Sequence, residues 1–146
     1  MPILPIVTGQ DTPILRKKTV NVTKVTKDIE ALIADMFLTV QDAKGAGIAA
    51  PQVDRTERIC IASIGGTLTP LINPVITWYG ETEDTMEEGC LSLPGIWIDI
   101  TRPTEVIVQF QTTKGKKLEL KLSGYDARVV QHEVDHLDGV LMIDRR

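Results

Sequence analysis

The chain has 146 residues, of which 42% are hydrophobic and 25% charged, and its net charge is −4. These values are ordinary for one globular domain with a buried core. No basic cluster could hold a phosphate backbone, and no apolar run approaches the roughly 20 residues that cross a bilayer. Neither nucleic acid nor a membrane is therefore expected as a partner. The N-terminus resembles neither a signal peptide nor a transit peptide, which favours a cytoplasmic protein.

The clearest helix is predicted over residues 26–44. Asp28 lies favourably in its first turn, and Gly45 is expected to end it. Six apolar residues recur there at helical spacing and form one stripe: Ile29, Leu32, Ile33, Met36, Phe37 and Val40. The next segment, residues 45–52, reads GAGIAAPQ. Its small residues suit either the close approach of a ligand or a helix end followed by a tight packing turn.

The middle of the chain is predicted to form antiparallel strands. Residues 58–64 are an apolar run, and residues 71–78 form a second one that Asn73-Pro74 interrupts, which indicates an edge strand or a bulge. Apolar residues then alternate along residues 96–101, 106–111 and 117–122. The last two strands are joined by Thr113-Lys114-Gly115, a good hairpin turn.

A second helix is predicted from near Ser123 to about Leu137, with Gly139 ending it and Asp126 completing a capping box at its start. The helix is apolar on two faces, so it should be buried. Alternating strands followed by such a helix predict an α+β fold, in which antiparallel sheets pack around a central helix.

This second helix carries the only two histidines of the chain, in the sequence HEVDH at residues 132–136. Positions four apart share a helix face, so His132 and His136 can bind one metal ion, and Glu133 can take a proton from a water that the metal activates. The alternative is a pair of core histidines satisfied by hydrogen bonds. Ligand spacing around a glutamate favours the metal site.

A catalytic metal usually has a third protein ligand. Cys90, in the sequence EGCLS at residues 88–92, is the best candidate, although a free cysteine is most often a small buried hydrophobe. Cys60 lies in the apolar run Ile59-Cys60-Ile61, so for Cys60 the buried interpretation is preferred.

Three segments together resemble the peptide deformylase family. Its members carry, in this order, the motifs G-x-G-hydrophobic-A-A-x-Q, E-G-C-hydrophobic-S and Q-H-E-x-D-H. The chain has GAGIAAPQ at residues 45–52, EGCLS at 88–92 and QHEVDH at 131–136, and each match is complete. The combination is far more specific than any one motif.

The resemblance implies an enzyme that removes the formyl group from the N-terminal formyl-methionine of new polypeptides and releases formate. Cys90, His132 and His136 would bind one divalent metal ion, usually ferrous iron in the family, with zinc, nickel or cobalt able to replace it. Glu133 would be the catalytic acid and base. The Gln52 side chain and the Leu91 backbone N–H would stabilise the developing oxyanion, and Gly47 would pair with the substrate backbone.

Other residues are assigned supporting roles or mark departures from the family. Glu88 and Asp135 are expected to orient the histidines or to pair with Arg102. Tyr125 stands where members often have an aliphatic residue, so the pocket for the methionine side chain could differ.

The chain is expected to be a single deformylase-like catalytic domain, residues 1–146, without the C-terminal helix that many bacterial members carry. That helix helps some members to dock on the ribosome, so a transient ribosome contact stays open. Two other functions compete with deformylation: a zinc peptidase that cleaves internal peptide bonds, and a binding module that keeps only the fold. The cysteine ligand opposes the first, and the presence of Gln52 and Glu133 opposes the second.

Overall fold

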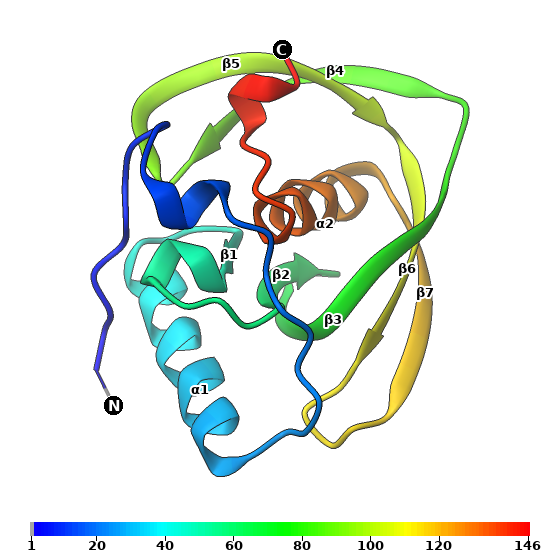
Figure 1. The fold of residues 1–146 in the computed structure, drawn as a ribbon. Coiled ribbons are helices and arrows are strands. Elements are labelled where there is room, and N and C mark those ends of the chain that lie inside the picture. Colours follow the sequence, from blue (N-terminus) through cyan, green and yellow to red (C-terminus); the bar gives the residue numbers. More distant parts are fainter. Residues whose placement is uncertain (1) are drawn as a thin grey trace.

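The structure, a computed structural model, describes residues 2–146 and contains two α-helices and seven β-strands (Figure 1). The helices are α1 (Lys27–Asp42) and α2 (Gly124–Leu137). The strands are β1 (Gly47–Ala49), β2 (Ile59–Ile64), β3 (Thr67–Tyr79), β4 (Glu83–Cys90), β5 (Leu93–Pro103), β6 (Glu105–Gln111) and β7 (Lys117–Ser123). Three short 3₁₀ helices are η1 (Pro13–Arg16), η2 (Ala50–Val53) and η3 (Met142–Asp144).

Helix α1 forms where its apolar stripe predicts it, but its end differs from the prediction. The Thr26 side chain caps its start by accepting a hydrogen bond from the Ile29 backbone N–H at 3.3 Å. The helix stops at Asp42, and Lys44 rather than Gly45 adopts the left-handed conformation, with φ of 55°. The Gly45 N–H still donates to the Val40 carbonyl, so the last turn remains satisfied.

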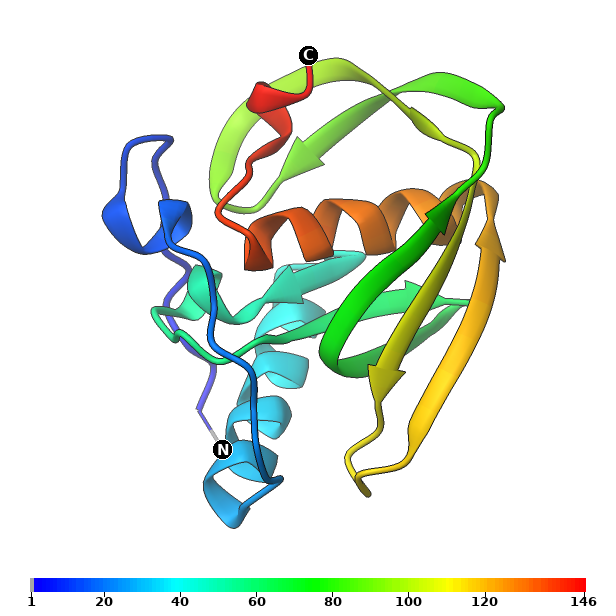
Figure 2. The same cartoon turned by 45° about the vertical axis from the view of Figure 1, so that its right-hand side comes forward.

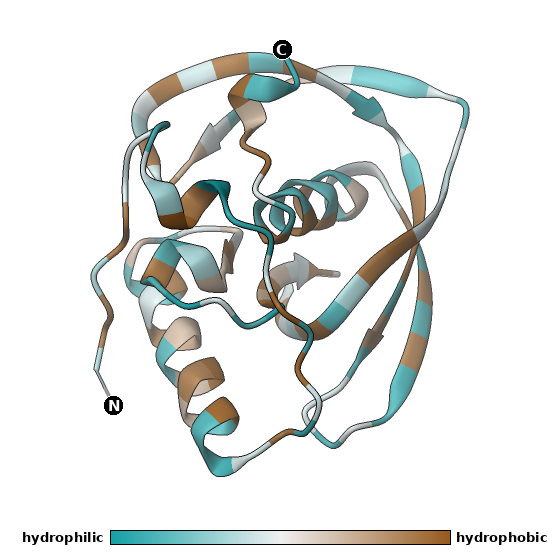
Figure 3. Cartoon of the chain, in the orientation of Figure 1, coloured by the Kyte–Doolittle hydropathy of each residue, from teal (hydrophilic) through white to brown (hydrophobic). Residues whose placement is uncertain are grey.

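Five strands form one antiparallel sheet in the order β1-β2-β3-β6-β7, and β4 pairs with β5 in a second sheet. The interruption predicted at Asn73-Pro74 is a bulge inside β3, which lies between β2 and β6 and is not an edge strand. Asn73 has φ of 52° there, and its side chain pairs with both backbone groups of Val22. The predicted hairpin between β6 and β7 is confirmed, and hydropathy alternates along these strands (Figure 3).

Helix α2 begins and ends close to the predicted residues, but its start is not capped as expected. The Ser123 side chain makes no capping bond, and the Asp126 carboxylate instead accepts a hydrogen bond from the Gly65 backbone N–H at 3.0 Å. At the other end Gly139 has φ of 75°, as a terminating glycine should. A side chain at Gly139 would also collide with the backbone of Arg16.

In both views α2 runs between the two sheets, with the β4–β5 sheet on one side and β1 and β2 on the other (Figures 1 and 2). Its apolar residues pack against the five-stranded sheet, where Cys60 is fully buried as predicted. The α+β class with antiparallel sheets is therefore confirmed. Among residues 2–146 no helix is both long enough and apolar enough to span a membrane.

Candidate metal centre

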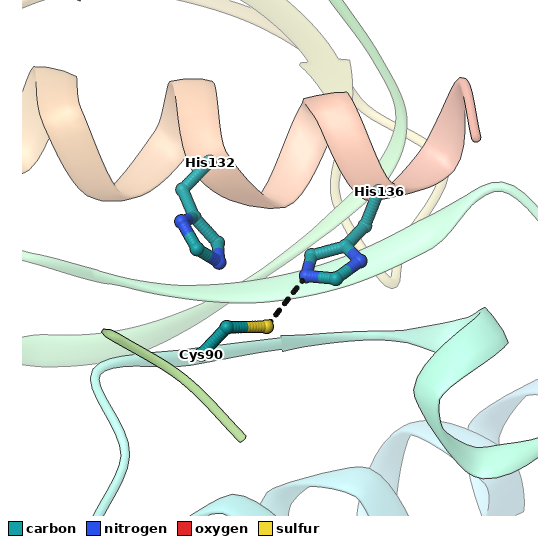
Figure 4. A group of neighbouring side chains, drawn as sticks. All are labelled: Cys90, His132 and His136. Atoms are coloured by element: carbon teal, nitrogen blue, oxygen red, sulfur yellow. Dashed lines mark hydrogen bonds between the residues drawn. The ribbon is translucent and has the colours of Figure 1, made fainter. Parts of the chain in front are cut away.

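The fold brings together three side chains that could bind one metal ion. One ligand atom from each of Cys90, His132 and His136 lies within 4.8 Å of the others. Both imidazoles project from the same side of α2 toward the sulfur at the end of β4, and the Cys90 Sγ is 3.3 Å from the His136 Nε2 (Figure 4). Helical spacing of four residues places the two histidines side by side, with ring centroids 5.1 Å apart.

The donor set suits a divalent transition metal, because a thiolate and two imidazoles are ligands of zinc and ferrous iron sites. Glu133 adds a second indication. Its carboxylate is buried, and within residues 2–146 its Oε1 atom has no hydrogen-bonding partner. A buried carboxylate oxygen without a partner is costly, so this position fits a group that receives a water or a substrate when the metal is present.

Burial and neighbouring charges shift the pKa values of these groups. Burial raises the pKa of Glu133 to about 7, although the positive charge of His132 opposes the rise. Burial would also lower the pKa of His132, but hydrogen bonds to Cys90 and Glu88 outweigh it and raise that pKa to about 10. Burial and the nearby His132 hold the pKa of His136 well below its usual range. The two imidazoles therefore differ in basicity, and His132 is the more basic of the two.

The second ring nitrogen of His132 is held by Glu88. The His132 Nδ1 lies 2.9 Å from the Glu88 Oε1, which leaves Nε2 free for a metal. Arg102 donates two hydrogen bonds to Glu88, at 2.6 and 3.0 Å, and a third to Asp135 at 2.9 Å. The predicted pairing of Glu88 and Asp135 with Arg102 is thus confirmed. Burial opposes ionisation of Glu88, but its bonds from His132 and Arg102 lower its pKa to about 2.

Gln52 is fixed in the short turn η2, next to the cysteine. Its Oε1 accepts a hydrogen bond from the Ala49 N–H at 2.9 Å, so its Nε2 must point the other way. That nitrogen lies 3.1 Å from the Ser92 Oγ and 3.9 Å from the Cys90 Sγ. The N-terminal segment secures the arrangement, since the Val7 N–H donates to the Gln52 carbonyl at 2.8 Å.

Position 47 requires glycine, because neighbouring atoms leave no room for a side chain. A Cβ atom at Gly47 would lie 2.7 Å from the Glu133 Oε2 and 2.8 Å from the Ile61 carbonyl oxygen, so no larger residue fits while Glu133 keeps its place. The glycine-rich segment is thus not only a helix end. It also makes room for the carboxylate that lies beside the metal ligands.

A cavity of about 540 Å³ opens onto this group, a volume typical of small-ligand sites. All the site residues predicted from the sequence line it except His136: Gly47, Gln52, Cys90, Leu91, His132 and Glu133. Tyr125, Ile96 and Trp97 add exposed apolar surface to its wall. Trp97 lies directly over Gly89, where a Cβ atom would meet the indole ring at 2.5 Å.

Sequence reasoning missed two polar residues of this region, Ser92 and Arg128. Ser92 is fully buried against Gln52, and Arg128 is buried against Glu88. Ser92 lies inside a motif, and that position could have drawn attention to it. Arg128 is four residues before His132, which puts it on the ligand face of the helix, and this spacing was the available signal.

Comparison with known proteins identifies the family. The family model described as polypeptide deformylase matches residues 3–146. The peptide deformylase of Thermotoga petrophila is 44% identical over 133 residues, covering 91% of this chain and 81% of the relative. The crystal structure of peptide deformylase from Thermotoga maritima is 40% identical and superposes with a TM-score of 0.95, covering 99% of this chain and 98% of that one.

A further structure of the same fold contains a peptide. It is the Met-Ala-Ser-bound class I type b peptide deformylase from Acinetobacter baumannii, which is 30% identical with a TM-score of 0.95 and covers 99% of both chains. The family model spans nearly the whole sequence, and the fold and the three motifs agree with it. The chain therefore belongs to the peptide deformylase family.

Proposed function

We propose that this protein hydrolyses the formamide of N-terminal formyl-methionine on new polypeptides and releases formate and a free amino terminus. The observation that carries the proposal is a group of three candidate metal ligands beside a cavity, which Cys90 and His132 line together with a buried Glu133 carboxylate that has an unsatisfied oxygen. Membership of the peptide deformylase family gives the reaction.

Cys90, His132 and His136 would hold one divalent metal ion, which supplies Lewis acidity that activates water and polarises the formyl group. The Glu133 carboxylate then accepts a proton from the attacking water and delivers it to the nitrogen of the departing amine. The Gln52 Nε2 and the Leu91 backbone N–H would donate to the formyl oxygen as it gains negative charge. The fixed orientation of the Gln52 amide supports this role, because its donor end faces Cys90.

The substrate backbone would pair with β1. This strand is at one edge of the five-stranded sheet and includes Gly47, which also lines the cavity. An extended peptide that adds to a sheet edge gains backbone hydrogen bonds, while its side chains enter neighbouring pockets. The Met-Ala-Ser peptide in the Acinetobacter baumannii structure supports a peptide occupant of this kind. The helix that carries His132 and His136, enclosed by both sheets, would give the site its rigidity.

The remaining expectations are proposed on the same basis. Residues 1–146 would form one catalytic domain that works in the cytoplasm, on polypeptides as they are made. A transient contact with the ribosome would suit that task.

Formate release tests the function directly. The protein loaded with metal should release formate from a formyl-Met tripeptide, and it should leave an N-terminally blocked peptide uncut at its internal bonds. Internal cleavage instead of formate release would establish the competing zinc peptidase function. Metal binding with neither activity would indicate a binding module.

Among the candidate metals we propose ferrous iron, with zinc, nickel or cobalt as substitutes. Protein purified without oxygen and loaded with iron should then lose activity in air, because ferrous iron and the Cys90 thiolate are open to oxidation. Nickel- or zinc-loaded protein should decay more slowly. The measurement is formate release against time of exposure to air, with metal content determined in each sample. Equal lifetimes for all three metals, with and without oxygen, would contradict an iron enzyme.

A further inference from the structure

A buried ionic cluster lies behind His132, and the family motifs account for only part of it. We define the cluster as Glu88, Arg102 and Arg128, all less than 10% exposed. Arg128 extends from α2, and its Nη1 donates to the Glu88 Oε2 at 2.6 Å and to the Ile100 carbonyl at 2.9 Å. Its Nη2 donates to the carbonyl and the carboxylate of Asp84, at 3.0 and 2.7 Å. All four terminal N–H bonds of the guanidinium therefore have partners within the protein.

Arg128 joins the helix of the metal ligands to both strands of the β4–β5 sheet. Asp84 and Glu88 belong to β4, and Ile100 belongs to β5. On α2 itself, Arg128 precedes His132 by one helical turn, so the two side chains project from the same face. The arginine thus contacts the carboxylate that holds His132, and it does so from the helix that carries His132.

The hydrogen bonds to Glu88 explain why its position matters. Its Oε1 is bonded by Arg102 and His132, and its Oε2 by Arg102 and Arg128. A carboxylate accepts about four such bonds, so Glu88 is saturated. It can therefore orient His132 without competing for the metal. The buried charges of Arg102 and Arg128 are balanced by Glu88 and the largely buried Asp135, whose side chain is 14% exposed.

We propose that Arg128 is a positioning residue of the metal centre, which fixes the Glu88 carboxylate and through it the ring of His132. Arg128 also lines the cavity, but its terminal N–H groups are already engaged, so it is not placed to bind a substrate anion. Removal of Arg128 would leave the Glu88 Oε2 with one donor in place of two, and Arg102 would then be the one arginine of the cluster that faces the carboxylates of Glu88 and Asp135. Glu88 would then shift, and His132 with it.

The test compares three variants by metal binding. Arg128→Met removes the charge and the donors but keeps a chain of similar length, and Arg128→Lys keeps the charge. Arg58→Met is the matched control. Arg58 is also a buried arginine that contacts α2, but it binds Asp138 and the carbonyls of Leu137 and Pro74, away from Glu88. Zinc affinity is measured by competition with a chromophoric chelator, and the visible spectrum of the cobalt-loaded protein reports ligand geometry.

Arg128→Met should weaken zinc binding by roughly 10- to 100-fold, the usual effect of losing a group that orients a metal ligand, and should alter the cobalt spectrum. Arg128→Lys should lie between it and the unmodified protein. Arg58→Met should keep the original affinity and spectrum, even if it unfolds at a lower temperature. Unchanged metal binding in Arg128→Met, or an equal loss in Arg58→Met, would overturn the proposal.

If Arg128→Met does not fold, Asp84→Asn takes its place. Asp84 is partly exposed, and this change removes the other carboxylate that anchors Arg128. It should still alter the cobalt spectrum, and an unaltered spectrum would overturn the proposal. The inference rests on the metal centre of the proposed function. Neither the zinc affinity nor the cobalt spectrum is measured with the formyl peptide. The inference about Arg128 can therefore fail while the proposed deformylation is upheld.

Discussion

Glu133→Gln should lower kcat for a formyl-Met tripeptide at least about a hundredfold while the metal remains bound. An amide has nearly the shape of the carboxylate, so the three ligands keep their places. The amide cannot accept the proton of the attacking water at neutral pH, and proton transfer by a positioned group typically contributes ~10²–10⁴-fold. The surroundings of Glu133 favour this role, because a carboxylate with an unsatisfied buried oxygen is available to a reacting group.

The measurement is steady-state kinetics with the metal quantified in every sample. Glu87→Gln is the matched control: it makes the same chemical change on an exposed glutamate at the wall of the same cavity. It should keep kcat within about twofold, as exposed substitutions usually do. If Glu133→Gln is as active as this control with its metal in place, the proton passes through another group.

The sequence predicts the elements whose patterns are local. The hairpin of β6 and β7 follows from alternation and a glycine turn, and α1 follows from its apolar stripe. The histidine pair follows from helical spacing alone. Strand β4 was not predicted, because half of its residues Glu83–Cys90 are acidic and Thr85 is the only β-branched residue among them. It forms because β5 pairs with it along its length.

Contacts between residues far apart in the sequence could not be predicted from local sequence patterns. Asp126 was assigned to a helix cap, but Gly65, 61 residues away, supplies its partner. Arg128 looked like an ordinary helix residue, since an arginine is usually exposed. Its burial depends on the β4–β5 sheet, and its carboxylate partners are 40 and 44 residues away. Cys90 was the best candidate for the third ligand on its residue type, and only the family motifs supported grouping it with the histidines, because no local spacing relates residues so far apart.

The second prediction concerns Gln52, which is proposed to donate a hydrogen bond to the formyl oxygen in the same reaction. Its Nε2 is the one donor of the side chain, and the backbone of Ala49 holds the amide so that this donor faces Cys90 and Ser92. Because the bond from Ala49 keeps the amide oriented, Nε2 would only have to exchange its long contact with the Cys90 Sγ for the formyl oxygen as charge develops there. A fixed donor of this kind stabilises the transition state more than the ground state.

Gln52→Leu should therefore reduce kcat by roughly 10²–10³, with a smaller change in KM. Leucine keeps the volume of the buried side chain but can neither donate to the oxyanion nor accept from Ala49. Ser92→Ala is the control, because it removes the hydroxyl that the same amide contacts and leaves both the donor and the bond from Ala49 in place. It should cost less than about tenfold in kcat, since only one neutral hydrogen bond is lost. The measurement is kcat and KM of both variants on a formyl-Met tripeptide at equal metal content. If Gln52→Leu changes KM alone, Gln52 binds the substrate and does not stabilise the transition state.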